Sequence, residues 1–259
     1  MEIKEQESTA TRPMEASDNG SLYAQGLSKS YGKNQAVAGI DIHVKAGEIV
    51  GLLGPNGAGK STSFYMMVGM MQPTSGNVCI GDTDITKYPM HKRARMGISY
   101  LPQEASVFRK LSVRQNLTAI AEVLPLSKAN QKEIVEQNLE RLNLTSVSSQ
   151  KAFTLSGGER RRLEIARALL CNPTFLLMDE PFSGVDPISV EGVQEMIKDL
   201  AHRGIGILLT DHNVRATLRV VNRASLIYEG KILAEGDREF LVNDPQCQSI
   251  YLGKEFVES

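Results

Sequence analysis

Short hydrophobic runs separated by turn residues begin at Leu22 and continue for most of the chain. Runs of this kind, rich in β-branched residues and bounded by Gly, Pro, Asn or Asp, are typical of strands. They predict strands over residues 22–27, 36–44, 48–53, 78–80, 98–101, 175–178, 205–210 and 224–229. Longer stretches with helical spacing of apolar residues predict helices over residues 61–71, 112–123, 128–142, 158–170 and 188–202.

This alternation of strands and helices predicts an α/β fold with a largely parallel sheet. The β-rich opening of the chain predicts a separate antiparallel layer. Residues from about 104 to 155 show no strand pattern, so we expect a helical insertion between two strands, within a helical subdomain of about 104–165. Because no linker or fixed-period repeat interrupts the pattern, residues 22–255 are expected to form one domain.

Composition narrows the possible functions without naming one. The chain has 259 residues, of which 41% are hydrophobic and 23% charged, as in ordinary globular proteins. Its 29 Lys and Arg residues nearly balance 30 Asp and Glu residues, so the bulk charge predicts no attraction to nucleic acid or to an anionic membrane. Cys79, Cys171 and Cys247 lie far apart, which argues against a disulfide framework or a zinc knuckle.

The sequence also bears on location. No apolar stretch is long enough to span a bilayer, and the first residues contain no hydrophobic segment of a secretory signal. A cytoplasmic location is therefore expected. Residues 1–20 are rich in Glu, Ser and Thr and predict a disordered tail.

The strongest chemical signal is a glycine-rich segment between the strand at 48–53 and a helix. Its residues Gly54, Pro55, Asn56, Gly57, Ala58, Gly59, Lys60, Ser61 and Thr62 fit the pattern G-x-x-x-x-G-K-[ST]. Glycines let such a loop curl so that backbone N–H groups point inward, and the following helix adds its positive end. We predict an ATP site in which Lys60 contacts the β and γ phosphates, Ser61 binds Mg²⁺ and Thr62 helps to hold phosphate oxygens. The plainer alternative is an ordinary glycine-rich turn.

Two adjacent acids follow the apolar run at 175–178. Asp179 and Glu180 would stand at the end of a parallel strand, where ligands of open α/β sheets bind. We assign Asp179 to Mg²⁺, either directly or from its second shell. Glu180 is the better candidate to polarise the attacking water, because that carboxylate must not be occupied by the metal. Acids often cap strands, so the pair is informative only together with the phosphate loop.

A second anion-binding element begins the helix predicted near residue 158. Ser156 suits an N-cap, and Gly157 and Gly158 expose N–H groups at the helix start. Since one ATP site already has a cradle, the second one indicates a role toward the nucleotide of another molecule. The three arginines at 160–162, taken singly, are interpreted as a solvated basic face.

With these motifs in this order, the chain resembles the ATP-binding subunits of ABC transporters. Besides the phosphate loop, LSGGE and the acid pair, it has Gln103 in YLPQE, Asp186 in SGVD, His212 in TDHN, and an aromatic residue, Tyr31, ahead of the loop. These match the family's Q-loop, D-loop, switch histidine and adenine-stacking position. The resemblance covers about residues 22–255 and implies a P-loop ATPase fold with a RecA-like parallel core, an antiparallel layer and a helical insertion.

Each single match also has a plainer interpretation. Tyr31 is compatible with simple packing, His212 with a structural histidine, and Gln103 with a cap on the helical insertion. In the family roles, Tyr31 stacks on adenine, His212 supplies a donor to charge developing on the γ-phosphate, and Gln103 touches Mg²⁺ and water.

The resemblance further implies the partners. It predicts a head-to-tail homodimer in which two ATP molecules lie between the phosphate loop of one chain and residues 156–158 of the other, with Asp186 at the interface. Closure on ATP and reopening after hydrolysis would drive a transmembrane permease pair through its coupling helices. The chain would then lie on the cytoplasmic face of the inner membrane through the permease alone, with no nucleic-acid partner.

A finer resemblance is to the lipopolysaccharide-export ATPases of Gram-negative bacteria. It is carried by residues 100–113, 155–169, 179–190, 210–218 and 251–256. The alternative is the ATPase of a branched-chain amino-acid importer, which shares RRLEIARAL but usually has Gln at the position of Glu159 and lacks a similar switch segment and YLGKEF tail. In the export type, Phe108 matches a residue of the groove for the coupling helix, while the plainer interpretation places it in the local core. The longer N-terminal tail and the short segment near 124–128 depart from the export type.

Two other classes of protein with a phosphate loop fit this sequence less well. A soluble ABC-type ATPase acting on DNA or ribosomes would carry a long coiled-coil insertion or two ATPase units, and a simple phosphotransferase would not need the LSGGE element. This sequence has neither the insertion nor a second unit, and it has LSGGE.

Overall fold

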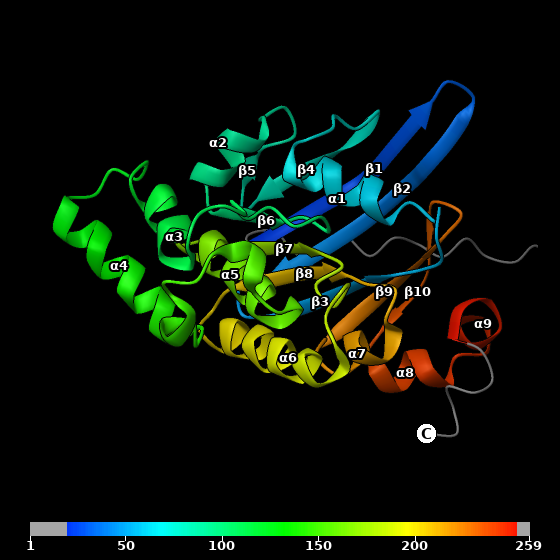
Figure 1. The fold of residues 1–259 in the computed structure, drawn as a ribbon. Helices are drawn as coiled ribbons and strands as arrows, with labels where there is room; N and C mark the ends of the chain where they lie inside the picture. The colour runs from blue at the N-terminus through cyan, green and yellow to red at the C-terminus, as the bar shows by residue number, and fades with distance from the viewer. Residues whose placement is uncertain (1–19, 253–259) are drawn as a thin grey trace, which may run out of the picture.

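The computed structural model describes residues 20–252 (Figure 1). Residues 1–19 of the tail predicted at 1–20, and the last part of the YLGKEF segment from residue 253 onward, lie outside this range.

The first of two sheets is antiparallel, as predicted for the opening of the chain, with strand order β2-β1-β4-β5. Its strands are β1 (Ser21–Tyr31), β2 (Asn34–Lys45), β4 (Ser75–Ile80) and β5 (Thr83–Asp84). β1 continues past its predicted end at residue 27 because Gly26 adopts a φ of 58° at a bulge, after which the pairing resumes.

The second sheet has six strands in the order β10-β9-β3-β8-β7-β6. These are β3 (Ile49–Leu53), β6 (Ile98–Leu101), β7 (Phe175–Asp179), β8 (Gly206–Thr210), β9 (Arg223–Tyr228) and β10 (Lys231–Gly236). All neighbouring pairs are parallel except β9 and β10. The carboxyl ends of β3, β6, β7 and β8 therefore meet at one edge, where ligands of such sheets bind.

Both faces of this sheet are covered, which is why every residue of β3, β7 and β8 is buried. Leu177 packs with α1 (Lys60–Val68) and the apolar side of the antiparallel sheet. Its neighbour Leu176 packs in the opposite cluster with α5 (Gly157–Leu169) and α6 (Pro187–His202). Successive residues of a strand point to opposite faces, so one apolar run serves two cores. Figure 1 shows α1 above and α6 below the sheet.

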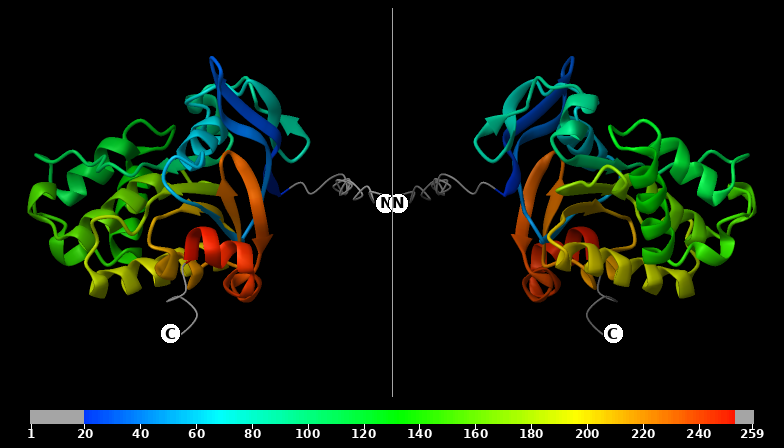
Figure 2. Two further views of the ribbon diagram at one scale, coloured as in Figure 1. Left: turned by 90° about the vertical axis from the view of Figure 1, so that its right-hand side faces the viewer. Right: turned by 90° about the vertical axis from the view of Figure 1, so that its left-hand side faces the viewer.

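The chain between β6 and β7 folds into helices. It contains α3 (Val113–Ala121), α4 (Lys128–Arg141), two short 3-10 turns, η1 (Thr145–Val147) and η2 (Ala152–Thr154), and then α5. Ser112 and Ser156 begin α3 and α5 with complete capping boxes, so the sequence defines both helix starts locally. α3 and α4 project at one end of the molecule, opposite the C-terminal helices (Figures 1 and 2).

Several short elements follow no clear pattern in the sequence. They are α2 (Met90–Arg95), α7 (Val214–Leu218), α8 (Arg238–Asn243), α9 (Pro245–Cys247) and the π-helical turn η3 (Gln248–Leu252). Each is too short to show helical periodicity, and tertiary packing stabilises it. No helix within residues 20–252 is long and apolar enough to cross a membrane.

Candidate functional site

The glycine-rich loop connects β3 to α1 at the carboxyl edge of the parallel sheet. The Lys60 ammonium is buried and donates to the carbonyl oxygens of Gly54 at 2.6 Å and Pro55 at 2.9 Å. Asn56 and Gly57, at the tip, are exposed, as is Ser61 in the first turn of α1. The loop therefore curls over its own lysine, and phosphate binding would exchange these carbonyls for phosphate oxygens.

Two glycines of the loop are required by close backbone approach. A Cβ on Gly54 would lie 2.2 Å from the Ile227 carbonyl oxygen, and one on Gly59 would lie 2.7 Å from that of Ala36. Their φ angles of 153° and 111° are also unfavourable for other residues. The loop is thus pressed against β9 and β2.

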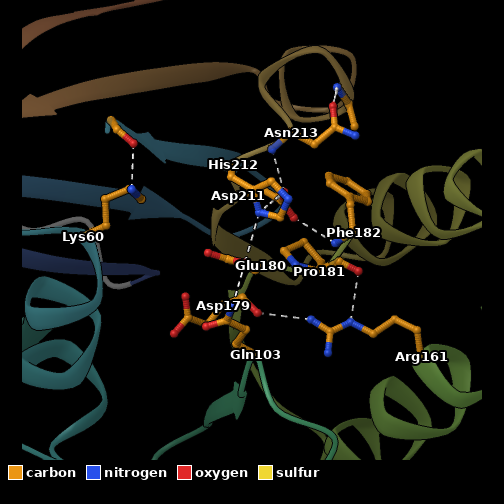
Figure 3. Close-up of polar contacts among 12 residues, drawn as sticks. Lys60, Gln103, Arg161, Asp179, Glu180, Pro181, Phe182, Asp211, His212 and Asn213 are labelled. Carbon is orange, nitrogen blue, oxygen red and sulfur yellow. Dashed lines mark hydrogen bonds and ion pairs between the residues drawn. The ribbon is translucent and has the colours of Figure 1, made fainter. Parts of the chain in front are cut away.

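The two acids stand at the end of β7, as predicted. Asp179 is 4% exposed, and the Tyr100 hydroxyl donates to its carboxylate at 3.3 Å. Glu180 follows with a φ of 48°, and this left-handed turn directs its carboxylate differently from a continuing strand. Gln103 Nε2 donates to that carboxylate at 2.8 Å, and His212 Nδ1 lies 3.1 Å from the same oxygen (Figure 3).

The strand order explains why three residues that are far apart in the sequence, Gln103, Glu180 and His212, lie close together. Gln103 follows β6, Glu180 follows β7 and His212 follows β8, which are adjacent parallel strands. The structure therefore brings together three residues that the sequence analysis could place only separately.

Burial sets the electrostatics of this edge. It raises the pKa of Asp179, and the neighbouring Glu180 carboxylate adds to the shift. Burial lowers the pKa of Lys60, while Glu180, Asp179 and Asp211 oppose that change. The buried Asp179 carboxylate beside Glu180 favours a cation, and the buried Lys60 ammonium favours an anion.

Asp211 is a residue of this site that the sequence analysis did not select. It is fully buried, and its carboxylate accepts from the backbone N–H groups of Phe182 and Asn213, both at 2.8 Å. It thereby joins the segment after Glu180 to the segment that carries His212. Burial raises the pKa of Asp211, and the two N–H groups oppose the shift.

Arg161 corrects a sequence interpretation. The sequence predicted that this residue belongs to a solvated basic face, but its side chain is buried, with 5% exposed. Its guanidinium donates to the carbonyls of Pro102, Asp179 and Pro181 at 3.1–3.2 Å. It also pairs with buried Glu164 at 2.8 Å. Arg161 therefore holds the backbone on both sides of the Gln103–Glu180 pair (Figure 3). The signal available in the sequence was an acid, Glu164, three residues after Arg161 on the same predicted helix.

The start of α5 lies against a different part of the molecule from the phosphate loop. The exposed Ser156 hydroxyl accepts from the Glu159 N–H and donates to the Glu159 carboxylate. A Cβ on Gly157 would lie 2.6 Å from the Gly184 carbonyl oxygen, and one on Gly158 would lie 2.8 Å from Ser189. These glycines allow the segment after β7 to pack against the helix start.

Three predicted residues lie away from the carboxylates. Tyr31 is 49% exposed at the end of β1, and its hydroxyl donates to the Met71 sulfur at 3.0 Å. Asp186 caps α6 by accepting from the Ser189 N–H. Phe108 is 45% exposed, which is wrong for a core residue, and the Arg167 guanidinium lies 4.6 Å from its ring centre.

A buried asparagine that the sequence analysis missed holds Phe108 at the surface. Asn116 accepts from the Phe108 N–H at 2.8 Å and donates to the Phe108 carbonyl at 3.1 Å. Asn116 thereby fixes the backbone from which the exposed Phe108 ring extends.

The donors present fit Mg²⁺. No cluster of three or more His, Cys, Asp or Glu residues within 20–252 is arranged to hold a metal ion. Mg²⁺ is commonly bound by one or two carboxylates and hydroxyls together with substrate phosphates. The Ser61 hydroxyl, the Gln103 amide oxygen and the buried Asp179 carboxylate are hard oxygen donors of that kind.

Comparisons with known proteins agree with this geometry. The sequence model of the family described as ABC transporter matches residues 37–183. The lipopolysaccharide export system ATP-binding protein LptB of Acidithiobacillus ferridurans is 52% identical over 235 residues, 91% of this chain and 98% of that protein. The protein of the same name from Escherichia coli strain K12 is 48% identical over 236 residues, again 91% and 98% of the two chains.

Solved structures show the same architecture. The crystal structure of a nucleotide-free ATP-binding cassette from an ABC transporter has a TM-score of 0.81 and 30% identity, covering 91% of this chain and 100% of that one. The ADP conformation of an ATP-binding cassette of an ABC transporter has the same TM-score and identity, covering 91% and 99%.

Proposed function

We propose that this chain, which belongs to the ABC transporter family and hydrolyses ATP as an ATPase of that family, powers the export of lipopolysaccharide. The observation that supports this substrate is the sequence identity of about 50% to LptB proteins, over 98% of their length. Lipopolysaccharide itself would contact the permease and not this chain.

The phosphate loop supports binding of the ATP triphosphate. Lys60 leaves the Gly54 and Pro55 carbonyls for the phosphates, while backbone N–H groups of residues 56–62 hold phosphate oxygens. Tyr31, half-exposed at the end of β1, stacks on adenine. Ser61, Gln103 and Asp179 hold Mg²⁺, which neutralises charge on the phosphate oxygens when bound.

The residues at the carboxyl edge support hydrolysis. Glu180 polarises the attacking water, since its carboxylate is held in place by Gln103 and lies beside His212 rather than in the more deeply buried position of Asp179. His212 supplies a donor to charge that develops on the γ-phosphate. Asp211 and Arg161 position these groups through the backbone and touch no reacting atom.

The exposed start of α5 supports a homodimer with shared ATP sites. Gly157 and Gly158 carry N–H groups at this helix start, where an anion is favoured, and Ser156 adds its exposed hydroxyl, since its own N–H donates to the Glu159 carboxylate. None of the three faces the loop of its own chain. The second chain would therefore present its ATP to them, with Asp186 beside the contact.

Phe108 supports docking of a permease helix. A half-exposed aromatic ring on a backbone that buried Asn116 holds is suited to anchor an apolar helix face. Through that contact alone the chain would lie on the cytoplasmic face of the inner membrane.

The proposal is tested by isolating the tagged full-length chain from detergent-solubilised membranes of its source cells and identifying its partners. Co-purification with lipopolysaccharide-export permease subunits is expected, whereas a branched-chain amino-acid permease would establish the alternative. Phe108→Ala should lose the permease while retaining nucleotide binding. Phe240→Ala, which removes another exposed ring, is the control and should retain both. Unchanged co-purification of Phe108→Ala would refute the docking role.

A further inference from the structure

The last described residues of the chain pack against the base of the phosphate loop. Tyr251 and Leu252, in η3, belong to an apolar cluster with Leu53, the last residue of β3 before Gly54. The same cluster contains Leu218, at the end of α7, which follows His212 closely in the chain. One small apolar cavity is lined by all four of these side chains. The C-terminal segment thus packs on the end of β3, just before the phosphate loop, and on the end of α7, which follows the segment of His212.

The Tyr251 hydroxyl is a polar group placed within this apolar cluster. Its oxygen is buried and makes no hydrogen bond of ordinary geometry to any residue within 20–252. Burying a hydroxyl without a partner is unfavourable, so a native protein usually satisfies the group in some state.

Packing brings this side chain to the start of the phosphate loop, because Tyr251 lies in one cluster with Leu53, the residue directly before Gly54. Burial raises the pKa of Tyr251, the Gly54 N–H opposes that shift, and the Asp211 and Glu180 carboxylates add to it. The packing on Leu53 and the opposing effect of the Gly54 N–H both point to the first residue of the loop as the neighbour of this hydroxyl.

We propose that Tyr251 is a positioning residue for ATP binding: its hydroxyl accepts the Gly54 N–H when Lys60 leaves the Gly54 carbonyl for phosphate. In the present arrangement Lys60 holds that carbonyl at 2.6 Å. Once the lysine turns to the nucleotide, Gly54 is free to adjust toward the hydroxyl, which gains the partner that it lacks. The C-terminal segment would in this way favour the nucleotide-bound form of the loop. This inference rests on nucleotide binding at the loop and is independent of the transported substrate.

The test is the full-length variant Tyr251→Phe, which removes only the hydroxyl and keeps the ring in the cluster. Its matched control is Tyr88→Phe, which removes a hydroxyl from an exposed tyrosine before α2. The probe is Mg²⁺ with a non-hydrolysable ATP analogue, and the readouts are the Kd, the melting temperature with and without nucleotide, and the KM and kcat for ATP.

For Tyr251→Phe we expect the Kd to rise about fivefold, which corresponds to about 1 kcal/mol. The melting temperature without nucleotide should stay the same or rise, because the unsatisfied hydroxyl is gone, while the stabilisation by nucleotide shrinks. KM should rise with kcat unchanged. Tyr88→Phe should match the parent throughout.

Two results would overturn the inference: a Kd within twofold of the parent, or a melting temperature that falls equally with and without nucleotide, as a purely structural role predicts. A parent chain that binds no nucleotide would instead refute the proposed function and the inference together.

Discussion

Replacement of Arg161 by Met tests whether a buried guanidinium organises the hydrolytic edge. Methionine keeps the apolar stem but removes four interactions: hydrogen bonds to the carbonyls of Pro102, Asp179 and Pro181, and the 2.8 Å pair with Glu164. The Glu164 side chain is only 4% exposed, so it would be left as an uncompensated buried charge.

The expected loss of stability follows from that burial. Breaking a buried ion pair by removing one partner costs about 3–5 kcal/mol, because the remaining charge stays out of water. For a domain of this size each kcal/mol lowers the melting temperature by about 2–4 °C, so a decrease of about 10 °C is expected. Arg160, one residue earlier, is exposed, and Arg160→Met should change the free energy of unfolding by less than about 0.5 kcal/mol.

A double variant separates stability from positioning. Arg161→Met combined with Glu164→Leu removes both charges and should recover at least about 2 kcal/mol of the free energy of unfolding, measured in urea. ATPase activity should remain low, because the three carbonyls around Gln103 and Glu180 still lack their donor. The reasoning fails if the single variant loses less than about 1 kcal/mol, or if the double variant regains activity together with stability.

Two further predictions concern the loop and the water-activating acid. Glu180→Gln should bind ATP and accumulate as a dimer on gel filtration while hydrolysis falls by about 10²–10⁴-fold, the usual contribution of a general base; turnover at the parent rate would exclude the assignment. Gly59→Ala should abolish nucleotide binding in a calorimetric titration, since its Cβ would lie 2.7 Å from the Ala36 carbonyl oxygen. A Cβ on Gly57 meets nothing within 4 Å, so Gly57→Ala should retain binding, weakened only by the backbone strain at its φ of 80°. Equal effects of the two alanines would show that steric contact with β2 is not what requires the glycine.

The site depends on backbone contacts more than on contacts between its own side chains. Asp211 holds the backbone of Phe182 and Asn213, Arg161 holds that of Asp179, and Asn116 holds that of Phe108. A buried polar side chain that satisfies backbone groups fixes a turn in one conformation, because releasing it would leave several buried groups without partners. Such residues place the acids and the exposed ring without contacting any ligand.

The sequence alone determined the parts whose chemistry is contiguous. The phosphate loop, the acid pair after an apolar strand and the capped start of α5 each lie within a few neighbouring residues, so local spacing predicts their conformation and purpose. The strand and helix pattern likewise predicted two sheets and a helical insertion, because alternation and helical periodicity are local properties. Short elements such as α2, α7 and α8 escaped prediction because packing rather than periodicity stabilises them.

Only the tertiary structure decided which distant residues meet. Gln103, Glu180 and His212 converge because β6, β7 and β8 are neighbours in the sheet, and strand order is not written in any one segment. Arg161 is buried because segments distant in the sequence pack over α5. Its neighbours in the sequence are arginines, and this local context predicted a solvent-exposed side chain. Tyr251 reaches the start of the phosphate loop from the other end of the chain. Local sequence sets what each residue can do, and the long-range packing of the apolar faces determines which of these capacities are brought together.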